Sequence, residues 1–208
     1  MSETEQLASI QRTSDPSRRR LLIAATGAVG AVGVGAAAWP FLASLRPSAR
    51  ALAIGAPVEV YIGDMTPGQL NRVQWRGSTI GILRRTDEML ANLEDLAPRL
   101  RDPDSGNADQ QPEYARNIHR SIKPEFLVVN MHCTHLGCVP SIFPQVGEQP
   151  FDSDWRGGFF CGCHRSTFDL AGRVFRGVPA GSNLLIPPHS YIDDNNIIIG
   201  EDPEQGAA

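Results

Sequence analysis

The sequence predicts a mainly β domain, an antiparallel β sandwich with one short helix, preceded by an N-terminal transmembrane helix. Short stretches with a period of two, separated by Gly and Pro, indicate the strands. One run with apolar residues at helical spacing indicates the helix, and an uncharged stretch near the N-terminus indicates the span. The chain has 208 residues and a net charge of -4, so it carries no basic footprint for nucleic acid.

The membrane span is predicted over residues 21–45, which contain no charged side chain. As a helix, this stretch is about 37 Å long at about 1.5 Å per residue, more than the roughly 30 Å of a bilayer's hydrocarbon core. The alternative is a buried core helix, but the glycines at positions 27, 30, 33 and 35 would pack loosely in a soluble core. Small residues at this spacing suit close helix contact in lipid.

Residues 17–22 read Ser-Arg-Arg-Arg-Leu-Leu and resemble a twin-arginine export signal. With Arg12, these arginines predict a cytoplasmic N-terminus, residues 1–20, and place everything after residue 45 across the membrane, in the periplasm. The alternative is cleavage at an Ala-x-Ala site over residues 36–38, but the uncharged stretch is longer than an ordinary signal core, which favours a retained anchor. Residues 46–54 then form a flexible neck, and residues 55–203 form one periplasmic domain.

Seven short strands are expected in this domain. The first is marked by Val58, Val60 and Ile62, and the others cover residues 69–75, 79–84, 125–131, 158–161, 167–175 and 196–200. A helix is predicted over residues 86–100, because Thr86 can cap it and Leu or Met recurs at helical spacing behind it. The polar residues 101–123 that follow are expected to form a surface loop.

All four cysteines lie in two short boxes, Cys133-Thr-His135-Leu-Gly-Cys138 and Cys161-Gly-Cys163-His164. Each box places a His within two residues of a Cys. A Rieske [2Fe-2S] centre needs two thiolates for one iron and two imidazoles for the other, and these boxes supply that set with two cysteines left over. The sequence therefore predicts an electron carrier.

Two other uses of the same residues are weaker. Two disulfides would account for the four cysteines but would leave His135 and His164 without a role. A tetrahedral zinc site would accept two Cys and two His, but the ligand spacings here are tighter than those of usual zinc motifs.

The pattern C-T-H-L-G-C followed by C-x-C-H-x-S-x-F-D resembles the two cluster-binding boxes of the Rieske iron-sulfur subunits of the cytochrome bc complex, ubiquinol-cytochrome c reductase. The resemblance implies the Rieske fold, with an inserted cluster-binding lobe over about residues 132–183, and one [2Fe-2S] cluster per subunit. The implied site has Cys133 and Cys161 on the inner iron, His135 and His164 on the outer iron, a Cys138–Cys163 disulfide, and a Ser166 hydroxyl that donates to a cluster sulfur.

The resemblance also implies the activity. The subunit would oxidise ubiquinol, with His164 and His135 as catalytic residues and His164 as the direct quinol contact, and would pass the electron to a c-type cytochrome. This transfer would contribute to proton translocation. Cytochrome b and the c-type cytochrome would be its partners in a dimeric complex of the bacterial inner membrane, and the subunit would not be active alone. The neck would let the cluster head swing between its partners, the alternative being an ordinary linker.

A second candidate is the Rieske subunit of another periplasmic oxidoreductase, such as an arsenite oxidase. The long span, the neck and the 22-residue excursion over residues 139–160 favour the quinol complex. This excursion is expected on the surface, as are His119 and His189.

Three positions depart from the commoner pattern of these subunits. Phe168 stands where many have a tyrosine that donates to a ligand thiolate, so we expect a lower reduction potential here. Arg165 stands where many have glycine, and its effect on the potential and on docking is left open. Residues 177–181, Gly-Val-Pro-Ala-Gly, resemble the proline loop that covers the cluster but differ from its commoner form.

Overall fold

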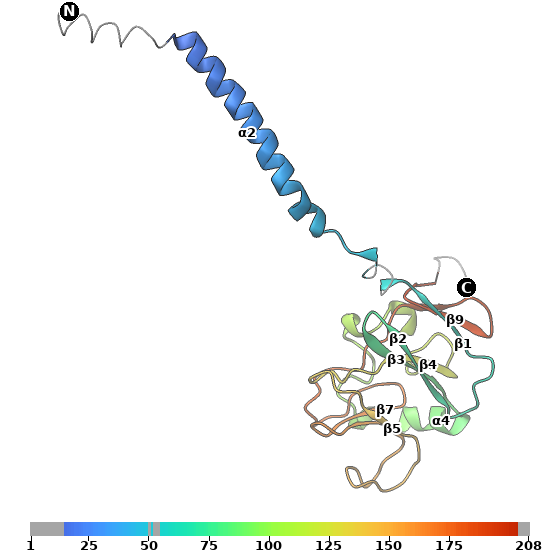
Figure 1. The fold of residues 1–208 in the computed structure, drawn as a ribbon. Helices are drawn as coiled ribbons and strands as arrows, with labels where there is room; N and C mark the ends of the chain where they lie inside the picture. The colour runs from blue at the N-terminus through green and yellow to red at the C-terminus, as the bar shows by residue number, and fades with distance from the viewer. Residues whose placement is uncertain (1–14, 50, 52–54, 204–208) are drawn as a thin grey trace, which may run out of the picture. The chain divides into compact units, whose positions relative to one another are not determined.

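The structure is a computed structural model that describes residues 15–49, 51 and 55–203. The chain divides into two compact units, Met1–Leu52 and Ala53–Ala208 (Figure 1). The predictions for residues 1–14, Arg12 among them, and for residues 50 and 52–54 of the neck lie outside the described residues.

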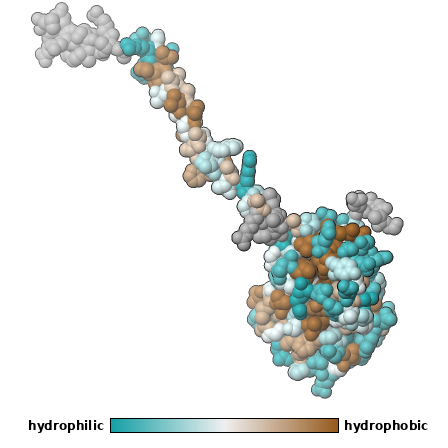
Figure 2. Space-filling model, turned by 45° about the vertical axis from the view of Figure 1, so that its right-hand side comes forward, coloured by the Kyte–Doolittle hydropathy of each residue, from teal (hydrophilic) through white to brown (hydrophobic). Residues whose placement is uncertain are grey.

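The described part of the first unit is dominated by one long helix, α2 (Pro16–Ser44). An Asp15 carboxylate oxygen accepts a hydrogen bond from the Ser17 N–H at 2.9 Å, and Pro16 starts the helix without losing a needed donor. No residue of α2 is buried, and its most apolar window has a mean hydropathy of 1.9, so it is long and apolar enough to cross a membrane. Figure 2 shows brown and pale residues along most of its length. It begins before the predicted span because the arginines at positions 18–20 are good helix formers.

The described part of the second unit contains three antiparallel sheets of three strands each. Their orders are β1 (Val58–Tyr61), β9 (Asn196–Ile199), β8 (His189–Tyr191); β2 (Leu70–Trp75), β3 (Ser78–Arg84), β4 (Phe126–Asn130); and β5 (Ser141–Phe143), β6 (Gly158–Cys161), β7 (Ser166–Asp169) (Figure 1). The predicted fold class, mainly antiparallel β with an inserted lobe, is confirmed.

The sheet of β2, β3 and β4 is covered on both faces. Ile82 and Val128 pack into one apolar cluster with Ile197 and Ile199 of β9, while Leu83 and Val129 pack into another cluster with residues of β6 and β7. Alternate side chains of a strand point to opposite faces, so β3 and β4 feed both clusters at once. This double burial explains the unbroken apolar run of β4.

The predicted helix over residues 86–100 forms in two pieces, α4 (Asp87–Asp95) and a 3-10 turn, η1 (Ala97–Arg99). The Thr86 hydroxyl oxygen accepts a hydrogen bond from the Met89 N–H at 3.2 Å, as expected for the cap. Pro98 has no N–H to continue the α-helical ladder, which explains the change. The predicted apolar stripe is buried at Met89, Leu93, Leu96 and Leu100.

The prediction of a surface loop over residues 101–123 is wrong in part. The segment contains two 3-10 turns, η2 (Ala108–Gln110) and η3 (Glu113–Ala115). It also buries five side chains, most of them polar: Ser105, Gln111, Ala115, Arg120 and Ser121. Polar composition did not predict exposure because several of these side chains find hydrogen-bond partners inside the protein.

Two short strands escaped prediction, and one predicted strand is a hairpin. β5 and β8 have three residues each, too few to show a period of two. The predicted strand over residues 167–175 turns back after β7, where the Gly172 N–H donates to the Asp169 carbonyl at 3.0 Å. Phe168 and Val174 then face each other across the turn.

Two surface predictions also need correction. The excursion over residues 139–160 buries Trp155 and Phe159 completely. Trp155 packs against Phe151 and Phe175, and Phe159 belongs to the apolar cluster that contains Cys133 and Cys161. His189 is fully buried at the start of β8, where its Nδ1 lies 2.9 Å from the Pro187 carbonyl oxygen.

Candidate iron-sulfur site

The first box forms a closed loop after β4. The Cys133 N–H donates to the Cys138 carbonyl, and the Gly137 N–H donates to the Cys133 carbonyl, both at 2.8 Å. Gly137 has a φ of 79°, a left-handed conformation that costs glycine little. The loop therefore holds Cys133 and His135 on one tight turn.

The second box forms the turn between β6 and β7. Cys161, the last residue of β6, pairs with Ser166, the first of β7, and the Arg165 N–H donates to the Cys161 carbonyl at 2.9 Å. Arg165 has a φ of 63°, in the left-handed region that glycine adopts most readily. Its side chain is exposed, so solvent screens its charge.

A close approach of β6 and β7 supports this turn. Gly158 pairs with Asp169, and a Cβ at Gly158 would lie 2.0 Å from the Phe168 carbonyl oxygen. No side chain fits there. Glycine at this position lets the two strands lie together and bring Cys161 next to Ser166.

Cys133 and Cys161 are free and almost fully buried, with 3% and 2% of their surface exposed. Burial raises the pKa of the Cys133 thiol and the neighbouring Cys161 thiol raises it further, while the His135 backbone N–H and the Ser166 side chain lower it. A bound metal ion would supply the positive charge that stabilises thiolates in this buried setting.

The two imidazoles lie beside each other, and they are less buried than the two thiols. His135 is half-buried and His164 is exposed. Their ring centroids are 4.7 Å apart and their planes are nearly perpendicular, at 87°. His135 Nδ1 is buried and has no hydrogen-bond partner in the protein. A buried ring nitrogen without a partner is costly unless it binds something else, such as a metal.

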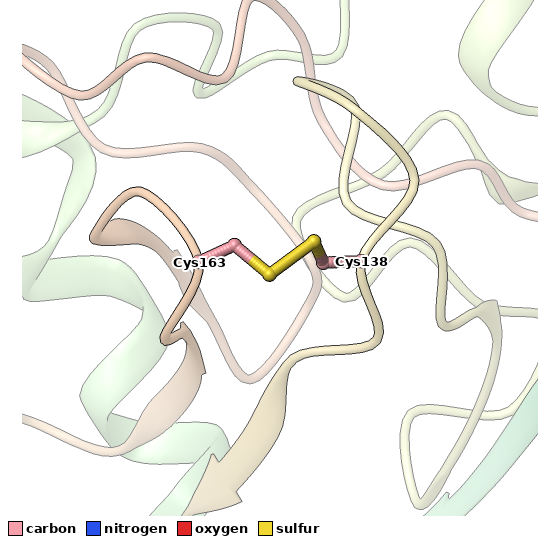
Figure 3. Close-up of a disulfide and its surroundings, with 2 residues drawn as sticks. All are labelled: Cys138 and Cys163. Carbon is pink, nitrogen blue, oxygen red and sulfur yellow. A yellow bond between two sulfur atoms is a disulfide. The ribbon is translucent and has the colours of Figure 1, made fainter.

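A disulfide joins Cys138 and Cys163, the pair that the resemblance implied (Figure 3). It links the first loop to the second across 25 residues of sequence. The sulfur atoms of Cys138, Cys161 and Cys163 all lie within 4.8 Å of one another. The disulfide therefore fixes the loops next to the free thiols.

Residues 177–182 form a third loop over the site. The buried Ser166 hydroxyl oxygen accepts a hydrogen bond from the Ala180 N–H at 3.0 Å, and the Thr134 hydroxyl donates to the Ser182 carbonyl at 2.7 Å. These bonds tie the third loop to both boxes. Sequence reasoning anticipated a covering loop but missed Thr134 and Ala180, whose contacts have no signal in residue type or spacing.

The residues present fit a [2Fe-2S] cluster held by two thiolates and two imidazoles. The two free thiols rule out the arrangement with two disulfides. The remaining donors are the two thiols and the pair of neighbouring imidazoles, one with an orphaned nitrogen, and this is the donor set of a Rieske centre. The fold and the site define the class: a Rieske-type iron-sulfur protein.

The comparisons with known proteins give the family. Residues 57–188 match the Rieske [2Fe-2S] domain, and residues 9–48 match the family described as Ubiquitinol-cytochrome C reductase Fe-S subunit TAT signal. The chain belongs to the family of ubiquinol-cytochrome c reductase iron-sulfur subunits. The second match supports the predicted twin-arginine signal, and the apolar helix α2 together with the family indicates a membrane-anchored chain.

Three relatives carry the name ubiquinol-cytochrome c reductase iron-sulfur subunit. That of Allochromatium vinosum is 56% identical over 185 residues, covering 89% of this chain and 89% of its own. That of Blastochloris viridis is 42% identical over 193 residues, covering 90% and 95%. That of Rhodospirillum rubrum is 38% identical over 201 residues, covering 96% and 100%.

Proposed function

We propose that this chain is the electron-transfer subunit of a cytochrome bc complex, where it oxidises ubiquinol and reduces a c-type cytochrome. The observation that carries the proposal is the pairing of two buried thiols with two adjacent imidazoles, of which His164 is exposed to solvent. A buried donor pair suits a protected inner iron, and an exposed imidazole suits contact with a substrate. The alternative subunit of an arsenite oxidase is not favoured, because the relatives are named for ubiquinol-cytochrome c reductase.

The ligands in this proposal are Cys133 and Cys161 for one iron and His135 and His164 for the other. When bound, the [2Fe-2S] cluster supplies a centre that accepts one electron and releases it again. Ser166 orients its hydroxyl by accepting the Ala180 N–H, which leaves its own proton free to donate toward the Cys133 sulfur. A donor here favours the reduced, more negative state.

His164 is the proposed quinol contact. An imidazole that binds iron through one nitrogen keeps the other nitrogen available, and in His164 the exposed ring can offer it to a hydroquinone hydroxyl. The hydroxyl would donate a hydrogen bond and then its proton to that nitrogen, and the accompanying electron would pass to the bound cluster. His135 is half-buried, so its ring is less accessible to substrate than that of His164.

The proposed setting follows from the N-terminal helix. Helix α2 anchors the subunit as a single span in the bacterial inner membrane, with residues 1–20 in the cytoplasm and the domain of residues 55–203 in the periplasm. Residues 46–54 form the neck that lets the head reach both ubiquinol at cytochrome b and the c-type cytochrome. The working unit is a dimeric complex, and the isolated subunit turns over no quinol.

Electron paramagnetic resonance of reduced membranes tests the proposal. The wild-type complex should show a Rieske signal that shifts when a quinone-site inhibitor is added, together with equal amounts of non-haem iron and acid-labile sulfide. His135→Ala and His164→Ala should each abolish the signal. His132→Ala is the matched control, because His132 is half-buried next to Cys133 but is not a proposed ligand. A full signal in either ligand variant, or none in the wild type, would refute the proposal.

A further inference from the structure

Among the residues that the structure describes, three arginines are buried in the protein interior, where charged side chains are rare. Arg85, Arg120 and Arg173 have 2%, 0% and 1% of their surface exposed. Desolvation lowers the pKa of Arg85 and of Arg120 to about 10, so both remain cationic at neutral pH.

Almost all of their hydrogen-bond acceptors are neutral. Arg85 donates to the carbonyl oxygens of Pro124, His119 and Leu170 and to the Ser121 hydroxyl. Arg120 donates to the carbonyls of Ala171, Gly172 and Gln110 and to the Gln111 side-chain oxygen. Arg173 donates to the carbonyls of Pro103 and Leu93, and to one carboxylate, Asp169. These bonds satisfy most of the guanidinium donors, although the buried Arg120 Nε has no partner in the protein, and they do not cancel the positive charge.

Asp169 is the one buried carboxylate among the described residues, and it forms an ion pair with Arg173 at 2.7 Å. Three positive charges and one negative charge leave a net buried charge of two positive. Asp102 also attracts Arg120, but it is partly exposed and its oxygens accept the Gly106 and Asn107 N–H groups. Solvent screens a charge at that position far more than a buried one.

This charge lies close to the iron-sulfur site. Asp169 is the last residue of β7, and Ser166, whose side chain acts on the Cys133 thiol, is the first. Three residues of strand span about 10 Å. Leu170 and Ala171, whose carbonyls Arg85 and Arg120 bind, belong to the same buried apolar cluster as Cys133 and Cys161. The medium between the arginines and the site is therefore apolar protein, which transmits an electric field better than water does.

We propose that Arg85, Arg120 and Arg173, offset in part by Asp169, raise the reduction potential of the cluster by stabilising its reduced, more negative state through the protein interior. The inference rests on the proposed function, because it needs a cluster at the two boxes. These side chains touch neither quinol nor cluster, so their role is electrostatic tuning. The three arginines would supply a positive field in a chain whose Phe168 lacks the hydroxyl donor that a tyrosine would offer there.

The expected size of the effect follows from Coulomb's law. At about 12 Å and an effective dielectric constant of about 20, one unit charge changes the ratio of reduced to oxidised cluster about tenfold. For a one-electron couple, a tenfold change corresponds to about 59 mV. Removing one arginine should therefore lower the midpoint potential by about that amount.

Potentiometric titration of the Rieske signal in membranes that contain the complex tests the proposal. Arg120→Gln removes the charge but keeps a polar group. It should lower the midpoint potential, so that the ratio of reduced to oxidised cluster at a fixed potential falls about tenfold. Arg120→Lys, which keeps the charge, should stay close to the wild type. Asp169→Asn removes a negative charge. It should raise the midpoint potential, so that the ratio of reduced to oxidised cluster at a fixed potential rises by a similar factor. Arg72→Gln, at an exposed position on β2, is the control and should leave the potential unchanged.

A purely structural role predicts a different pattern. If Arg120→Lys lowers the potential as far as Arg120→Gln does, or if Asp169→Asn fails to raise it, the inference is wrong. If Arg120→Gln assembles no cluster, Arg120→Lys and Asp169→Asn decide, and loss of the cluster in all three would assign the network to folding alone and overturn the inference. Absence of a Rieske signal in the wild type would instead defeat the proposed function.

Discussion

Replacing both disulfide cysteines, Cys138→Ser with Cys163→Ser, should destabilise the cluster-bearing domain while leaving the two free thiols in place. The disulfide joins residues 25 apart in sequence. In the chain-entropy description, closing a loop of that length restricts the unfolded chain by an amount worth about 3.5 kcal/mol at 25 °C. The loop is also packed in the folded state by aromatic residues, Phe151 against Phe160 and Trp155 against Phe175. Those contacts remain in the variant, so the loss arises mainly in the unfolded state.

A destabilisation of about 3.5 kcal/mol should lower the Tm of a domain of this size by roughly 7 to 14 °C. The assay is thermal unfolding of the full-length protein in detergent, followed by circular dichroism, for the wild type and the double variant. Adding a disulfide-reducing agent supplies a matched control, because it should lower the Tm of the wild type toward that of the variant and leave the variant unchanged.

Two results would refute this reasoning. One is a Tm for the double variant within about 2 °C of the wild type, since that difference corresponds to less than about 1 kcal/mol. The other is an equal response of both proteins to the reducing agent, which would show that the agent acts elsewhere.

Two further predictions follow from buried residues. Phe168 is fully buried in the apolar cluster that contains Cys133 and Cys161, so Phe168→Tyr should add a donor near a ligand sulfur and raise the midpoint potential by about 30 to 60 mV; a protein-film titration with no rise would contradict this. Burial lowers the pKa of His189 below 6.5, so the folded state favours the neutral ring and stability is complete above the unfolded-state pKa. Below about pH 6.5 the free energy of unfolding should fall by up to about 1.4 kcal/mol per pH unit until the folded-state pKa is reached. Denaturant unfolding at pH 7 and pH 5 should show that the free energy of unfolding falls less in His189→Gln than in the wild type. Part of the fall should remain, because burial also lowers the pKa of His119. An identical fall in both proteins would exclude His189 as the cause.

Local patterns predicted the elements whose signals are local. The cap at Thr86 and the apolar stripe behind it predicted α4, and alternation or continuous apolar runs predicted β1, β4 and β9 within a few residues. β5 and β8 were missed because three residues cannot display a period of two. The hairpin after β7 was read as one strand because its turn at Gly172 lies between two apolar arms.

Burial was the quantity that local patterns judged worst. Arg120 and His189 are polar residues in segments rich in Pro, Asn and Gln, and composition placed both segments on the surface. Each is buried by contacts with distant segments: Arg120 binds carbonyls of residues 171 and 172, some 50 positions later in the chain, and the His189 ring packs edge to face with the Tyr114 ring. Such partners become visible only after the chain has folded.

The sequence alone determined the donor set and the membrane span. Residue types decide which atoms can bind iron, and length with the absence of charge decides whether a helix can cross a bilayer, so both properties are local. The tertiary structure decided that the two boxes, separated by an excursion of 22 residues, face each other. It also decided that His164 is exposed while Cys133 and Cys161 are buried. The three buried arginines bind residues 169–172, at the end of β7, only in the folded chain. These are relations between distant segments, and they follow from packing around a shared apolar core, which no single stretch of sequence specifies.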